Sequence, residues 1–181
     1  LGMAVVPGGD ELVVRSGTTV CILSRDMSSG ASFELPTEFG HIAAGEQFVY
    51  ATGTGGAITS LEVASYAEVA SYEDPERYIF SPIFAPGGLL FGVLSDDNEL
   101  ELDEIIALDA QTLQPRYRFG LSLLNNACGL VVVGEELFVC DKERDRMQVF
   151  SLAGEHRRSI TGEWKGPVAL CRVKDRLYLV E

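Results

Sequence analysis

The sequence lacks any hydrophobic run that reaches the roughly 18 residues of a membrane-spanning helix. It also lacks a basic segment followed by an apolar one near its start, the pattern of a secretion signal. The first residue, Leu1, is not a natural start, so we expect the chain to be a piece or a processed product of something longer. The missing hydrophobic run predicts no transmembrane helix, and the acidic net charge disfavours an anionic membrane surface, so we expect no membrane partner.

Basic residues are scarce. Lys and Arg together number 14 against 27 Asp and Glu, which gives a formal net charge of -13 at neutral pH. Nucleic-acid affinity comes largely from basic side chains that neutralise phosphates, so the charge argues against a nucleic-acid partner. An acidic surface permits a basic partner, although it also serves simply to keep a protein soluble.

Paired metal ligands are missing as well. The sequence has four cysteines, none in a Cys-x-x-Cys pair, and two histidines. The cysteines lie in or beside apolar strand-like runs, as free thiols do in a protein core: Cys21, Cys128, Cys140 and Cys171. This pattern predicts no zinc site and favours a reducing, cytoplasmic compartment, while a disulfide stays open.

Convincing helical patterns are also absent, and short apolar runs separated by turn residues take their place. A hairpin pattern occurs five times, at residues 4–14, 41–50, 82–93, 130–139 and 169–180. Equivalent positions in these hairpins recur at a period of roughly 36 to 47 residues: Leu12, Phe48, Leu90, Leu137 and Leu177. The sequence therefore predicts an all-β repeat protein.

Two further strand-like runs follow each hairpin except the last, so the chain holds about four and a half four-stranded units. The expected units are residues 1–37, 38–78, 79–120, 121–163 and a partial unit at 164–181. We treat them as one domain.

The second strand of a unit is apolar on both faces. Leu137 and Val139 point one way, and Phe138 and Cys140 point the other. A strand covered on both sides loses its polar alternation, whereas the fourth strand, His156–Ile160, is polar. Small sheets stacked face to face around an axis would produce this gradient, so the pattern predicts a β-propeller of four-stranded antiparallel blades. A β-sandwich would alternate in every strand.

The last third of the chain carries a more specific motif. Leu137–Asp141 is followed by Arg146–Leu152, and Gly166–Ala169 is followed by Leu177–Glu181. Together these segments resemble blades of the NHL-repeat β-propeller family. The resemblance implies a closed ring of six blades, of which the chain would supply about four and a half; a five-bladed ring stays open as an alternative, although its last blade would lack two strands and expose an edge.

Two charged residues match the family pattern, in which the second strand ends in Asp and the third begins with Arg. Asp141 and Arg146 occupy these positions, while Arg144 stands where the family usually has Asn. We expect Asp141 and Arg146 to form a structural ion pair that fixes the loop between the two strands.

An acidic loop precedes the third strand of the third unit. It contains six carboxylates: Asp96, Asp97, Glu99, Glu101, Asp103 and Glu104. Clustered carboxylates can hold calcium, but the spacing does not match the EF-hand loop. We interpret the segment as a solvated insertion and as a candidate binding site for a basic partner.

Catalytic signatures are not found. The sequence contains no Gly-x-Ser-x-Gly motif, and we predict no catalytic residue, cofactor or metal ligand. Propeller hydrolases of the lactonase type bind a metal near the axis through carboxylates and Asn, and Asn125 and Asn126 precede an inner strand. A metal-dependent hydrolase or lyase is therefore the alternative hypothesis.

The function that these observations favour is a non-catalytic platform that binds another protein or a peptide on the loops of a propeller. RNA binding, known for some NHL proteins, conflicts with the acidic charge.

Overall fold

The structure is a computed structural model of the whole chain, and it describes residues 2–5, 11–16, 19–24, 29–34, 39–53, 56–65, 67–96 and 103–181. Within these ranges the chain forms four antiparallel sheets of four strands each and one two-stranded sheet. The first two sheets contain β1 (Gly2–Val5), β2 (Glu11–Ser16), β3 (Thr19–Ser24), β4 (Ser29–Glu34), β5 (Phe39–Ala44), β6 (Phe48–Gly53), β7 (Ile58–Glu62) and β8 (Glu68–Tyr72). The other three contain β9 (Tyr78–Ala85), β10 (Leu89–Ser95), β11 (Glu104–Asp109), β12 (Pro115–Phe119), β13 (Ala127–Val133), β14 (Glu136–Asp141), β15 (Arg146–Ser151), β16 (His156–Thr161), β17 (Ala169–Val173) and β18 (Arg176–Val180).

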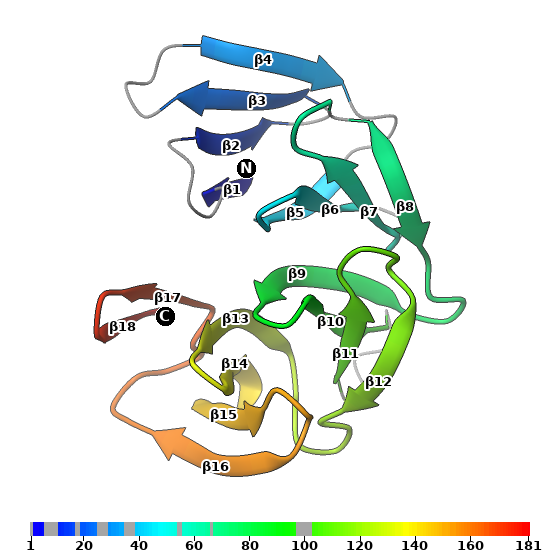
Figure 1. Cartoon of the computed structure of the whole chain (residues 1–181). Coiled ribbons are helices and arrows are strands. Elements are labelled where there is room, and N and C mark those ends of the chain that lie inside the picture. The colour runs from blue at the N-terminus through cyan, green and yellow to red at the C-terminus, as the bar shows by residue number, and fades with distance from the viewer. Residues whose placement is uncertain are drawn as a thin grey trace.

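Each four-stranded sheet has its strands in sequence order, and the neighbouring strands pair antiparallel. The first strands of consecutive sheets contact one another around the middle of the molecule, from β1 to β17 (Figure 1). The fourth strands lie on the outside of the resulting arc. This radial stack of blades confirms the predicted β-propeller architecture.

The third blade shows how the sheets are held together. In β10, Leu90 and Leu94 pack in one cluster with residues of the second blade, such as Tyr50. Phe91 and Val93 belong to the cluster shared with the fourth blade. All four β10 side chains are fully buried, and each contributes roughly 1.5–3 kcal/mol through removal of apolar surface from water. An inner strand is therefore apolar on both faces because each face contacts a different blade.

The fourth blade repeats this arrangement. Leu137 and Val139 of β14 join the cluster shared with the third blade. Phe138 points to the other side, where Leu170 of β17 packs against its cluster. Gly129 of β13 allows this approach, since a Cβ there would lie 2.7 Å from the Cα of Ala169.

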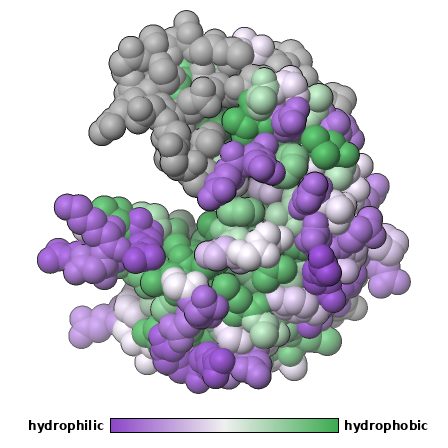
Figure 2. Space-filling model, in the orientation of Figure 1, coloured by the Kyte–Doolittle hydropathy of each residue, from purple (hydrophilic) through white to green (hydrophobic). Residues whose placement is uncertain are grey.

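Polarity rises from the axis outwards, as the sequence predicted. The outer strands β8, β12 and β16 consist mainly of exposed or half-buried residues. Figure 2 shows hydrophilic residues along the outer side of the arc and hydrophobic ones toward its inner side. The hairpin of β17 and β18 differs from the other inner strands, because most of its residues are exposed.

Among the described residues, the single short helix is η1 (Lys142–Arg144), one 3-10 turn. None of the described residues forms a helix with the length and apolar character required to span a membrane.

Candidate functional site

The acidic loop is described in part. Asp97, Glu99 and Glu101 lie outside the described residues. Asp103 is buried, and its carboxylate accepts a hydrogen bond from the backbone N–H of Ala127 at the start of β13.

Glu104, the first residue of β11, forms an ion pair with Arg77, with 3.3 Å between the charged atoms. Both side chains are more than four-fifths buried, so their contact joins the entry of β9 to β11. Asp103 and Glu104 therefore contact other parts of the propeller rather than standing free in solvent.

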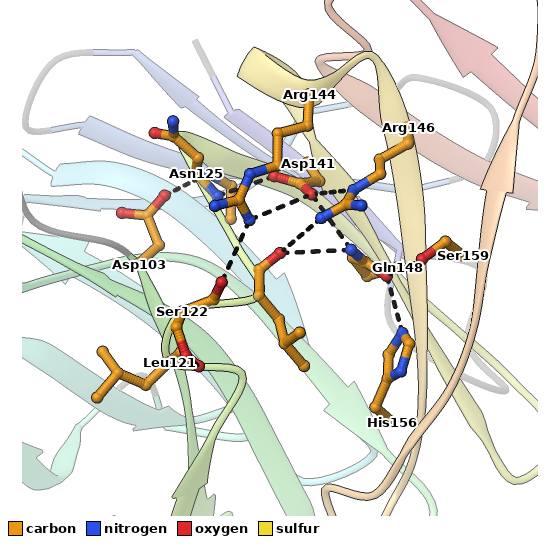
Figure 3. A network of polar contacts seen from close by, with 12 residues as sticks. Asp103, Leu121, Ser122, Asn125, Asp141, Arg144, Arg146, Gln148, His156 and Ser159 are labelled. Atoms are coloured by element: carbon orange, nitrogen blue, oxygen red, sulfur yellow. Dashed lines mark hydrogen bonds and ion pairs between the residues drawn. The ribbon is translucent and has the colours of Figure 1, made fainter.

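Asp141 lies at the centre of a polar network between β14 and β15 (Figure 3). Its side chain is fully buried, and its Oδ2 accepts a hydrogen bond from Nε of Arg146 at 2.6 Å. Its Oδ1 accepts one from the backbone N–H of Asn125 at 2.8 Å. The guanidinium of Arg146 also donates to the backbone oxygen of Leu123 at 3.2 Å. The ion pair thus ties the end of the β14–β15 hairpin to the segment that enters the fourth blade.

Gln148 extends the network toward the outer strand. Its side-chain amide lies 2.9 Å from Nε2 of His156 and 2.7 Å from the hydroxyl of Ser159. We assign the amide oxygen to the side of Arg146, whose guanidinium nitrogens are 2.7 and 2.9 Å away, because the opposite orientation sets donors against donors. The ring of His156 also packs edge-on against Phe150. His156 and Ser159 of β16 therefore both contact the buried side-chain amide of Gln148 on β15. These contacts hold the two strands together.

The two asparagines of the alternative hypothesis lie just before β13. The backbone oxygen of Asn125 accepts from the N–H of Glu143 at 3.3 Å, and the side chain of Asn126 donates to the carboxylate of Glu143 at 3.2 Å. In the described ranges, no three His, Cys, Asp or Glu side chains are grouped so that they could hold a metal ion. The contacts of this loop fasten it to η1.

Two thiols lie side by side in the fourth blade. A hydrogen bond from Cys140 lowers the pKa of Cys128 to about 7, and the same contact raises the pKa of Cys140. All four cysteines are free thiols. Cys140 is buried, as the sequence predicted, but Cys171 is exposed because it lies in β17. The apolar run around Cys171 resembles that of a core strand, so its exposure could not be read from the sequence.

A pocket of about 310 Å³ lies where the second blade meets the third. Its inner wall is aromatic and comes from both blades, with Phe48 and Tyr50 on β6 and Phe84 on β9. Tyr50 and Phe84 stack with their ring planes 10° apart and their centroids separated by 6.2 Å. Glu46 and Asp109 supply carboxylates to its lining. The lining of the pocket thus combines aromatic rings with carboxylates.

Hydrogen bonds fix the acidic side of this pocket. Asp109 ends β11, and its Oδ1 accepts from the backbone N–H groups of Gln111 and Thr112 at 3.0 and 2.9 Å. Arg116 donates to Oδ2 at 2.6 Å, and this hydrogen bond lowers the pKa of Asp109 well below its usual range. Burial, with a smaller effect of Asp109, raises the pKa of Tyr50 well above its usual range, so the hydroxyl stays protonated. The sequence analysis missed this site because its walls come from three strands of two blades.

One of three comparisons with known proteins found a match, and it supports the architecture. No protein-family model matches the chain, and no curated protein matches it. Among solved structures, it is similar to a chain in the crystal structure of a nidogen/laminin complex, with a TM-score of 0.82 and 14% sequence identity. The similarity covers 100% of this chain and 71% of that one. At this identity the likeness concerns the fold, and it establishes that the chain folds as a β-propeller.

Proposed function

We propose that this chain is a non-catalytic platform that binds another protein or a peptide through the loops and blade seams of its propeller. The observation that carries the proposal is the structural similarity to a β-propeller from a protein–protein complex. The fold supports it, because inner strands such as β10 are buried on both faces, whereas the connections between strands of a propeller lie at its surface, where a partner can reach them.

We further infer that the fourth blade is of the NHL type. The pattern that suggested this family places Asp at the end of the second strand and Arg at the start of the third. Asp141 and Arg146 are paired across this turn, at the end of a continuous register between β14 and β15. The ion pair gives the motif a physical reason, since it closes the hairpin and anchors the preceding segment.

The charge of the chain indicates the kind of partner. A net charge of -13 attracts basic surfaces and repels acidic ones over distances of about a Debye length, roughly 8 Å at physiological salt. Binding is therefore expected to be faster at low ionic strength. The remaining carboxylates of the acidic loop, Asp96, Asp97, Glu99 and Glu101, stay a predicted contact region for such a partner, whereas Asp103 and Glu104 are engaged within the propeller.

Selection from a displayed peptide library on the immobilised chain tests the proposal, followed by binding measurements at two salt concentrations. We expect enrichment of peptides with dissociation constants on the order of micromolar, and weaker binding at high salt. Failure to enrich any peptide above the bare support, together with metal-dependent turnover of a lactone or ester, would overturn the proposal in favour of the hydrolase hypothesis.

A further inference from the structure

We propose that the pocket between the second and third blades binds the side chain of an arginine or lysine presented by a protein partner. The inference rests on the proposed platform function and names the chemistry that one of its sites would recognise. Its walls are the aromatic rings of Phe48, Tyr50 and Phe84, with the carboxylates of Glu46 and Asp109 beside them.

The aromatic wall suits a cation better than it suits a neutral polar group. The face of an aromatic ring carries negative electrostatic potential, so an ammonium or guanidinium within about 6 Å of the ring centre is attracted to it. Phe48 and Phe84 flank Tyr50, with ring centroids 6.3 and 6.2 Å from that of Tyr50. Three adjacent rings also cover the methylene stem of a basic side chain, whose burial adds favourable apolar contact.

The hydroxyl of Tyr50 is an incomplete hydrogen-bonding group. No hydrogen bond joins this hydroxyl to a residue in the described part of the chain, and the oxygen is not among the fully buried side-chain atoms that lack a partner, so it faces the open space of the pocket that Tyr50 lines. A phenolic oxygen that faces a pocket can accept a hydrogen bond from a bound group. An N–H of a guanidinium or ammonium in the pocket would donate to this oxygen.

The charges of the lining also favour a cation. Glu46 lies exposed in the turn between β5 and β6, and within the described residues its carboxylate has no charged partner. Asp109 is paired with Arg116, whose own side chain is 58% exposed. The three groups together carry one net negative charge, and no Lys or Arg is among the described residues that line the pocket. An anion would therefore be repelled, and an apolar group would form no hydrogen bond with the Tyr50 hydroxyl.

The size and rim of the pocket point to a side chain on a polypeptide. A volume of about 310 Å³ is at the lower end of the range for small-molecule sites, roughly 300–1,000 Å³, which suits one long side chain rather than a cofactor. Gly87 and Gly88 form the β9–β10 turn at the rim, and a Cβ on either would meet no atom within 4 Å. The N–H of Ala110 holds this turn through a 2.9 Å hydrogen bond to the Gly88 oxygen. The backbone of a partner can thus approach a rim that is open and fixed.

The probe for this inference is Nα-acetyl-arginine amide, with Nα-acetyl-citrulline amide as a neutral molecule of the same shape. Titrations of the full chain followed by NMR should show saturable binding of the arginine probe at millimolar concentrations and at least tenfold weaker binding of the citrulline probe. Glu46→Gln should weaken arginine binding about fivefold and Tyr50→Phe about threefold. Glu68→Gln, which removes one exposed carboxylate from β8, is the matched control and should change nothing.

Equal binding of the two probes, or equal affinities in Glu46→Gln and Glu68→Gln, would overturn the inference. The peptides selected for the platform test separate the two proposals. Peptides that bind wild type and Glu46→Gln equally, while the arginine probe does not bind, refute the pocket and leave the platform standing. Arginine binding that depends on Glu46, in a chain that selects no peptide and turns over a lactone or ester with a metal, supports the basic-side-chain chemistry of the pocket and refutes the platform.

Discussion

Replacing Asp141 by Asn tests whether its buried ion pair stabilises the fourth blade. Asn has the same shape but carries one acceptor oxygen and one donor nitrogen in place of two acceptors. Asp141 accepts from Arg146 on one side and from the N–H of Asn125 on the other. Either orientation of the new amide therefore turns a donor toward a donor, and the charge that neutralises Arg146 is lost.

The expected cost follows from burial. Removing one partner of a fully buried ion pair costs about 3–5 kcal/mol. Arg146 is 27% exposed and can recover part of its hydration, so we expect a loss near the lower limit, about 3 kcal/mol. For a chain of this size, this loss corresponds to a decrease in melting temperature of about 6–12 °C.

Asp145→Asn is the matched control for this experiment. Asp145 accepts from the N–H of Gly166 at 2.7 Å and pairs with Lys165 at 3.0 Å, but its side chain is 44% exposed. Exposed pairs contribute little to stability because water screens them, and the amide can still accept from Gly166. Urea unfolding followed by the fluorescence of Trp164 measures both variants. Losses that agree within about 0.5 kcal/mol would refute the stabilising role of the buried pair.

Three further predictions concern packing and exposure. Leu137→Ala should lower the free energy of unfolding by about 2–5 kcal/mol, because this side chain is fully buried. Leu177→Ala should lower it by less than about 1 kcal/mol, because Leu177 is 36% exposed, and similar urea midpoints for the two variants would contradict this prediction. Gly129→Ala should cost about 1–3 kcal/mol because its Cβ would collide with the backbone of β17; an unchanged midpoint would show that the two blades do not pack this closely. Cys171 should be alkylated in the folded protein and Cys140 only after unfolding, as mass mapping of the labelled peptides can determine; rapid native labelling of Cys140 would show that the fourth blade opens.

The strands and turns were predictable because their signals are local. Alternating and continuous apolar runs, separated by Gly- and Asp-containing turns, predicted the hairpins that the structure shows. Leu137 and Phe138 were assigned to opposite faces from the pleat alone, and they belong to different clusters. The ion pair of Asp141 and Arg146 was also expected, because its members lie on either side of one short turn.

The aromatic pocket could not be predicted in this way. Tyr50 and Phe84 are in different blades, and Asp109 is at the end of a third strand. Their sequence neighbours resemble those of ordinary core strands, and only the packing of the blades brings them together. The same reason accounts for Asp103, which appeared to be part of an acidic surface loop but accepts a hydrogen bond from the next blade.

The sequence by itself determined the repeat, the antiparallel hairpins and the rise in polarity from inner to outer strands, because periodicity and turn chemistry act between residues close along the chain. The tertiary structure alone decided which surfaces are covered. Leu137 and Leu177 occupy equivalent positions in the repeat, but the first is buried between two blades while the second is partly exposed. Burial depends on contact between segments that are distant in the sequence. The residues next to Leu137 and Leu177 in the sequence therefore do not indicate which of the two is buried.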